Sequence, residues 1–100
     1  MNQITIPNQT KINELFNRSG VIYAAIFGSR VKGTAKENSD YDILIEYDKT
    51  EKYSLTDLVS LKRELEKNIS GEVDLVTTRG LNPKIAQEVQ NAAKVIYDRK

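Results

Sequence analysis

The strongest constraint on the fold is one unbroken apolar run, Val21–Phe27 (VIYAAIF). The run is rich in β-branched and aromatic residues, which favours a strand. A strand that is apolar on both faces is typical of the buried centre of a sheet. A chain of 100 residues has room for one domain around such a strand. We therefore predict a single domain that spans residues 1–100.

Further elements are marked by apolar periodicity between polar breaks. Ser54–Asn68 repeats leucine at helical spacing, and Ser54 with Asp57 forms a capping-box pattern at its start. Asn82-Pro83 opens a later helix. In all, we expect helices at 8–17, 54–68 and from 82, a short helix or turn at 29–35, and strands at 21–27, 40–47, 72–77 and 95–97. This order predicts an α+β (α/β) domain with a single small sheet.

Two absences narrow the chemistry that the chain can perform. It contains no Cys and no His, so thiolate nucleophiles, imidazole bases and metal sites built on Cys or His are excluded. Carboxylates, hydroxyls, Lys, Arg or Tyr must carry any catalysis. Carboxylate and hydroxyl oxygens favour a hard cation such as Mg²⁺.

Charge and hydropathy argue against two classes of partner. The net charge is +1, without a long basic run, so we expect no direct nucleic-acid binding. No segment approaches the roughly 20 apolar residues of a membrane span, and the N-terminus lacks the pattern of a signal peptide. We expect a cytoplasmic protein with no membrane contact.

Two aspartates open the predicted strand at 40–47. Asp40 and Asp42 are separated by one residue, so both carboxylates point to the same face, roughly 7 Å apart along the backbone. Ile43 and Ile45 occupy the other face and point to the core, which leaves the aspartates on the open side or at its rim. Two like charges so close repel each other, and a divalent cation would relieve that repulsion. The alternative is a helix cap, a turn cap or a partly solvated strand end.

Two further features extend this cluster. Asp74 is an isolated carboxylate in an apolar strand, where burial without a partner would be costly. If its strand neighbours that of Asp42, it completes a set of three carboxylates; a solvated rim position is the alternative. Gly28-Ser29 ends the central strand, where glycine permits close backbone approach and the serine hydroxyl can hold phosphate oxygens. A phosphate platform that faces a carboxylate–metal cluster suits phosphoryl or nucleotidyl transfer.

These residues together resemble the signature of the DNA polymerase β-like nucleotidyltransferase superfamily. That signature is Gly-Ser, about ten residues, Asp-x-Asp, and a third acidic residue on a following strand. Gly28, Ser29, Asp40, Asp42 and Asp74 match it in order. The wider patterns Gly-Ser-Arg-x-x-Gly and Ser-Asp-x-Asp resemble the minimal nucleotidyltransferase (MNT) branch, whose members are antitoxins of about this length.

The resemblance implies a fold, cofactors and roles. The fold is the polymerase β-like one, with a small mixed sheet and helices. Asp40 and Asp42 would hold two Mg²⁺ ions, and Asp74 would bind the metal nearer the acceptor and help to deprotonate the attacking hydroxyl. Gly28 and Ser29 would hold the β- and γ-phosphates of ATP.

The biological expectation also follows from the resemblance. The chain would transfer AMP from ATP to a tyrosine hydroxyl of a partner HEPN-domain toxin, as the antitoxin of a type VII toxin–antitoxin system. Arg30 is a candidate for contact with phosphate or with the partner, and a solvated charge is the alternative. Formation of a homo-oligomer stays open. The competing functions are a non-catalytic antitoxin that acts by binding and a small-molecule (antibiotic) nucleotidyltransferase.

Overall fold

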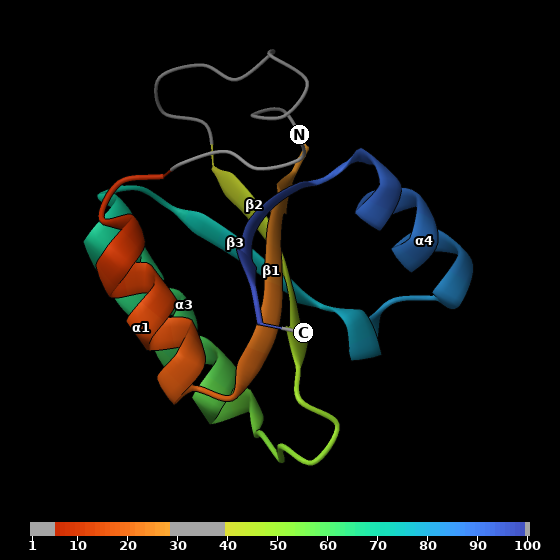
Figure 1. Cartoon of the computed structure of the whole chain (residues 1–100), viewed down its shortest axis with the longest axis horizontal. Helices are drawn as coiled ribbons and strands as arrows, with labels where there is room; N and C mark the ends of the chain where they lie inside the picture. Colours follow the sequence, from red (N-terminus) through yellow and green to blue (C-terminus); the bar gives the residue numbers. More distant parts are fainter. Residues whose placement is uncertain (1–5, 29–39, 100) are drawn as a thin grey trace.

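The computed structural model describes residues 6–28 and 40–99. Figure 1 shows one small sheet with helices on either side. The elements are α1 (Gln9–Arg18), β1 (Val21–Phe27), β2 (Tyr41–Tyr47), α3 (Leu55–Ile69), β3 (Val73–Thr77), the 3₁₀ helix η1 (Thr78–Gly80), α4 (Pro83–Ala92) and β4 (Lys94–Asp98). These bounds confirm the predicted strands and the three longer helices to within one or two residues at most ends. The element expected at 29–35 lies outside the described residues.

The sheet has the strand order β3-β2-β1-β4. β1 is antiparallel to both of its neighbours, whereas β2 and β3 are parallel. A parallel pair requires a crossover connection, and α3 supplies it. The apolar run in β1 therefore lies inside the sheet, as its composition predicts, and the parallel β2–β3 pair makes the sheet mixed.

The main core lies between the sheet and the helices α1 and α3, which cover one face (Figure 1). Ile43 and Ile45 of β2 are fully buried on this face, as predicted. Ile12 and Phe16 of α1 and Leu65 of α3 pack into the same cluster. Tyr41 is partly buried against it, which agrees with a packing role.

α4 lies on the opposite side of the sheet from α1 and α3 and contacts β1 (Figure 1). Ala25, Leu44 and Ala93 are buried, yet they do not belong to the main core cluster. Because strand side chains alternate, Leu44 shares its face with Asp42. This face is therefore covered at Leu44, and Asp42 lies toward its rim.

Side chains at the helix ends show how local sequence sets the boundaries. Ser54 accepts a hydrogen bond from the Asp57 backbone N–H, and Asp57 accepts one from that of Ser54, so the predicted capping box is present. Asn8 stands at the N-cap of α1 but makes no capping bond with its side chain. The backbone of Asn8 is left-handed (φ 57°), and its side-chain amide donates a hydrogen bond to the backbone carbonyl of Asn68 at 2.6 Å. Asn8 therefore joins α1 to the end of α3.

Removal of the capping box should measurably weaken the fold. We expect Ser54→Ala to lower the free energy of unfolding by about 1 kcal/mol, because the N–H of Asp57 loses its acceptor. Urea denaturation at neutral pH measures this loss. Ser60→Ala, at an exposed position inside the same helix, is the control and should cost little or nothing. Equal losses in the two variants would contradict the capping role.

Two tyrosines and an arginine stack on one another at the end of the sheet where β2 ends. The rings of Tyr47 and Tyr53 stack with centroids 4.0 Å apart, and the Arg79 guanidinium lies 5.1 Å from the centroid of Tyr53. Arg79 also donates to the carbonyls of Asp48 (2.8 Å) and Glu51 (3.2 Å). These contacts tie η1, which follows β3, to the loop that follows β2.

Tyr47 should make the fold sensitive to alkali. Burial, followed by the nearby Tyr53 and Asp57, raises the pKa of Tyr47 from 10.0 to about 12. The unfolded chain therefore loses this proton first as the pH rises, so the contribution of Tyr47 to stability declines between pH 10 and 12. We expect Tyr47→Phe to flatten the fall of melting temperature over this range, measured by circular dichroism. If the melting temperature fell equally in the parent and in Tyr47→Phe over this pH range, Tyr47 would not be the cause of the alkaline sensitivity.

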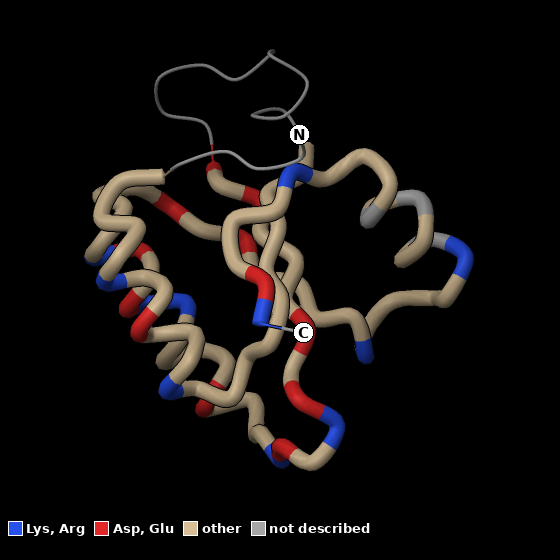
Figure 2. The backbone as a smooth tube through the Cα atoms, viewed as in Figure 1, with Lys and Arg blue, Asp and Glu red and all other residues tan. Residues whose placement is uncertain are grey.

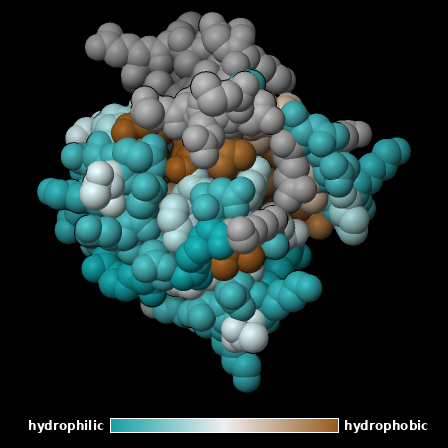
Figure 3. Space-filling model, viewed as in Figure 1, coloured by the Kyte–Doolittle hydropathy of each residue, from teal (hydrophilic) through white to brown (hydrophobic). Residues whose placement is uncertain are grey.

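Most of the surface seen in Figure 3 is hydrophilic, with small apolar areas beside the grey atoms. Across residues 6–28 and 40–99, we find no helix with the length and apolar character to span a bilayer.

Candidate active site

Gly28 directly follows β1, and its backbone lies close to the side chain of Asp42. Phe27, the last residue of β1, pairs in register with Asp42 of β2. The chain then turns at Gly28 with φ at 77°, a conformation that side chains with a Cβ disfavour. A Cβ atom at this position would also clash with Oδ2 of Asp42. The close approach of backbone and carboxylate therefore requires glycine at residue 28.

The parallel pairing of β2 and β3 brings two predicted site residues together. Asp42 and Asp74 are direct partners in the register. Neighbouring strands lie about 4.8 Å apart, and side chains of paired residues share a face. The strand adjacency that the sequence left open is thus present. Asp40 immediately precedes β2 and is exposed, as is Asp74, whereas Asp42 is half-buried.

Asp42 is affected by burial and by the charges of the other two carboxylates. Burial, then the charge of Asp74, then that of Asp40, raise the pKa of Asp42 above its ordinary value. Figure 2 shows acidic positions on the backbone where β2 begins. A site that disfavours the ionised form of Asp42 suits a cation, because a positive charge would offset both the burial and the repulsion.

The donor set fits a hard divalent cation, since carboxylate oxygens are the ligands that Mg²⁺ prefers. Within residues 6–28 and 40–99, however, no three acidic side chains adopt an arrangement that could hold a metal ion. The sheet pairs Asp42 with Asp74 and leaves Asp40 at the start of β2. Metal ligation by these three residues stays a prediction.

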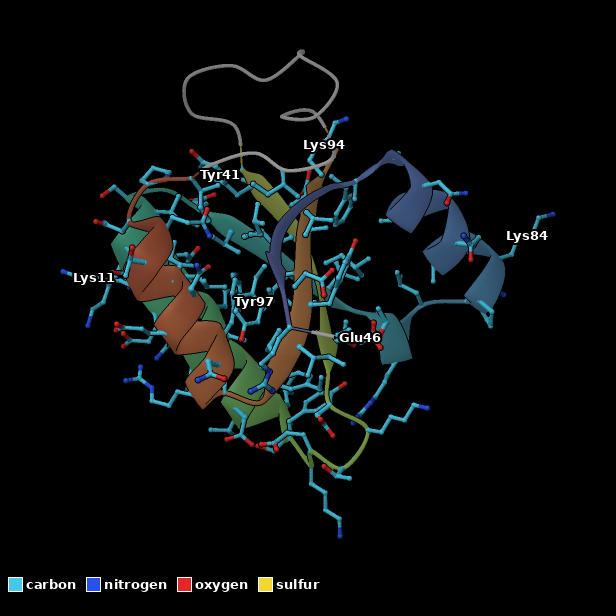
Figure 4. All side chains as sticks on the ribbon, in the orientation of Figure 1. Lys11, Tyr41, Glu46, Lys84, Lys94 and Tyr97 are labelled. Atoms are coloured by element: carbon cyan, nitrogen blue, oxygen red, sulfur yellow. The ribbon has the colours of Figure 1, made fainter. Side chains whose placement is uncertain are left out.

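Other predicted residues are placed as follows. Ser29 and Arg30 lie outside the described residues. In Figure 4, Tyr41 and Lys94 lie at the same end of the sheet as the site, and Lys94 points beyond it. Lys94 pairs with Ile26, a residue of the main core, so it lies on the other face of the sheet from Asp42.

One contact beside the site was not anticipated from the sequence. Glu66 of α3 accepts a hydrogen bond from the backbone N–H of Val73, which precedes Asp74. The signal available in the sequence is weak. Glu66 directly follows the inward-facing Leu65, and a helical residue next to the apolar stripe can reach the neighbouring strand.

Comparison with known proteins agrees with this geometry. The family model described as polymerase beta, nucleotidyltransferase, matches residues 10–100. The chain is 42% identical over 83 residues to MJ0435 of Methanocaldococcus jannaschii, which is named provisionally as a protein adenylyltransferase; the match spans 83% of this chain and 87% of that protein. It is 41% identical over 84 residues to the protein adenylyltransferase MntA of Thermococcus cleftensis, spanning 84% of this chain and 81% of the relative.

Solved structures share the fold. One, described provisionally as a minimal nucleotidyltransferase, has a TM-score of 0.73 and 33% identity over 85% of each chain. A toxin–antitoxin crystal structure with AMP-PNP has a TM-score of 0.74 and 26% identity, covering 91% of this chain and 73% of that one. The structure of a tri-AMPylated Shewanella oneidensis HEPN toxin in complex with an MNT antitoxin has a TM-score of 0.66 and 22% identity. The match covers 91% of this chain and 70% of that one.

These matches confirm the predicted polymerase β-like fold and the resemblance on which it was based. The family consists of enzymes that transfer nucleotides, and the two relatives carry the name of protein adenylyltransferases. By its sequence and its sheet, this chain belongs to the polymerase β nucleotidyltransferase family, in the minimal nucleotidyltransferase branch.

Proposed function

We propose that this chain, as one nucleotidyltransferase domain, transfers AMP from ATP to a tyrosine hydroxyl of a HEPN-domain toxin in a Mg²⁺-dependent reaction. It would thereby act as the antitoxin of a type VII toxin–antitoxin system. The observation that carries the proposal is the Asp42–Asp74 register pair, with the Gly28 backbone against Asp42. It is supported by the adenylyltransferase relatives and by the toxin–antitoxin complexes of the same fold.

The different exposure of the three carboxylates suggests a different role for each in metal binding and in contact with the acceptor. Asp42 is half-buried and close to Gly28, which favours a fixed ligand that meets the phosphate end of the nucleotide. Asp74 is exposed on β3, at the edge of the sheet, where a macromolecular acceptor can approach. We assign Asp40 and Asp42 to metal binding and Asp74 to the metal nearer the acceptor.

The transfer replaces the phosphoanhydride bond between the α- and β-phosphates of ATP by a phosphodiester bond to tyrosine. The tyrosine oxygen attacks the α-phosphorus of ATP, the bond from this phosphorus to the pyrophosphate oxygen breaks, and pyrophosphate leaves. Asp74 takes the proton of the hydroxyl, directly or through water. Bound Mg²⁺ would neutralise charge on the phosphates and stabilise the leaving pyrophosphate. Gly28, Ser29 and Arg30 are assigned to the phosphates.

We propose a protein acceptor because two relatives are named as protein adenylyltransferases. The toxin–antitoxin complexes with the same fold support a partner of this kind.

The test is incubation of the purified chain with ATP, Mg²⁺ and the HEPN toxin encoded beside it. We expect the toxin to gain the mass of one or more adenylates on a tyrosine, identified by intact-mass and peptide mass spectrometry. EDTA should prevent the gain. No adenylate on a folded toxin would overturn the proposal, and retained neutralisation without transfer would favour an antitoxin that acts by binding. Drug-dependent pyrophosphate release without a toxin would favour a small-molecule substrate.

A further inference from the structure

The contact between Glu66 and Val73 joins the crossover helix to the strand that carries Asp74. Oε2 of Glu66 lies 3.0 Å from the backbone nitrogen of Val73. Glu66 is half-buried in the last turns of α3, and Val73 is 2% exposed at the first position of β3. The bond therefore spans only the short connection between the two elements, beside the candidate site.

The backbone of β3 explains why this N–H needs a partner. Tyr41 of β2 donates to the carbonyl of Glu72 at 2.9 Å, so that carbonyl faces β2. The N–H of Val73 belongs to the same peptide group and points the other way, because the C=O and N–H of a trans peptide are opposed. β3 is the last strand on this side of the sheet order, so no described strand can accept the bond. A buried N–H without an acceptor would be costly.

A carboxylate acceptor at this place faces an unfavourable helix end but gains a stronger hydrogen bond. Glu66 lies near the C-terminal end of α3, where the helix macrodipole disfavours negative charge. The Asp42–Asp74 pair at the start of the neighbouring strands adds further negative charge. In return, a bond from a backbone N–H to a charged acceptor is stronger than one to a neutral acceptor.

The position of Asp74 depends on where β3 begins. Val73 pairs with Tyr41, and Asp74 then pairs with Asp42. A slip of one residue would turn every side chain of β3 to the opposite face, and Asp74 would leave the face of Asp42. A fixed N–H at Val73 opposes such a slip, and also opposes fraying of the first residues of this edge strand.

We propose that Glu66 is a positioning residue: its carboxylate holds the N–H of Val73 and thereby keeps Asp74 opposite Asp42. The contribution to catalysis rests on the proposed function, in which Asp74 serves the acceptor, whereas the structural part does not. Gln at residue 66 offers a carbonyl oxygen of similar reach and should therefore retain most of the effect. Ala removes the acceptor altogether.

The structural part is tested by NMR on the isolated full chain. In Glu66→Ala we expect hydrogen exchange of the Val73 amide to quicken by about tenfold or more relative to amides of β1, since bonds to charged groups are of that strength. The nuclear Overhauser contacts between Asp42 and Asp74 should weaken. In Glu66→Gln, the protection of the Val73 amide and the contacts between Asp42 and Asp74 should both stay close to those of the parent. Glu64→Ala is the matched control, because it removes an exposed carboxylate of the same helix whose ion pair is with Lys67 at 3.8 Å.

The functional part is tested with Mn²⁺ binding, followed by paramagnetic relaxation, and with AMP transfer to the toxin. We expect Glu66→Ala to lower kcat about 5- to 20-fold and to leave KM for ATP nearly unchanged, since Gly28 and Asp42 stay in place. Mn²⁺ should broaden the Asp74 signals less than in the parent. Circular dichroism at the assay temperature confirms that each variant is folded, so a loss of folded protein is not read as a loss of kcat.

The outcomes separate the two proposals. Unchanged Val73 exchange and unchanged Asp42–Asp74 contacts in Glu66→Ala would overturn the positioning role, whether or not the parent chain transfers AMP. Altered contacts with unchanged kcat and unchanged Mn²⁺ broadening would limit Glu66 to stability and overturn its link to the site. If the parent chain transfers no AMP, the proposed function fails, and the NMR results still decide whether Glu66 places Asp74.

Discussion

Asp42→Asn should greatly slow AMP transfer without loss of the fold. Asn matches Asp in shape but removes the charge on which the proposed binding of Mg²⁺ depends. We expect kcat to fall about a thousandfold, which corresponds to about 4 kcal/mol of transition-state stabilisation. Stability in the absence of metal should stay the same or rise, because burial and the charges of Asp74 and Asp40 disfavour the ionised side chain. The measurements are single-turnover transfer to the toxin and urea denaturation in EDTA.

Glu72→Gln is the matched control for this substitution. Glu72 is exposed and lies two residues before Asp74, at the same end of the sheet. Its backbone carbonyl, which accepts from Tyr41, is left intact by the change. Transfer should stay within about twofold of the parent, because exposed charges interact weakly. If both variants lost activity equally, general electrostatics and not a ligand at Asp42 would be the cause.

Gly28→Ala should reduce transfer far more than it reduces stability. Ala at φ 77° costs about 1–2 kcal/mol through backbone strain alone. The new methyl group would also displace the Asp42 carboxylate, which the glycine backbone approaches closely. A shift of about 1 Å in a positioning group can cost about a hundredfold in rate. We therefore expect kcat to fall by that factor in protein that circular dichroism shows to be folded.

Gly20→Ala separates strain from displacement. Gly20 has a similar φ of 84°, and a Cβ there would likewise meet a carboxylate side chain, that of Glu51. Gly20 precedes β1, however, at the opposite end of that strand from the site. We expect a comparable loss of stability with transfer nearly unchanged. A similar fall in kcat for both variants would show that strain, and not the position of Asp42, governs the rate.

Much of the fold follows from local sequence. The bounds of β1 agree with the apolar run Val21–Phe27, because a run that is apolar on both faces is stable only inside a sheet. Ser54 with Asp57, and Pro83 at the first position of α4, begin their helices as predicted, since capping depends on neighbours in sequence. Asn8 shows the limit of this reasoning, because its side chain bonds to Asn68, sixty residues away.

The residue types of the candidate site were also predicted from the sequence alone. Without His or Cys, carboxylates are the side chains predicted to hold a metal ion, and the spacing of Asp40 and Asp42 predicts two carboxylates on one face of a strand. In the structure β2 begins at Tyr41, so Asp40 lies just before the strand. What only the tertiary structure decided is how distant segments meet: that β3 pairs with β2 in the register Asp42–Asp74, that Gly28 closes on Asp42, and that Glu66 holds Val73. The register of paired strands and the hydrogen bonds at an edge strand are made by backbone groups, which are the same in every residue but proline. Only the packing of the folded chain therefore selects one register and one set of partners among the alternatives.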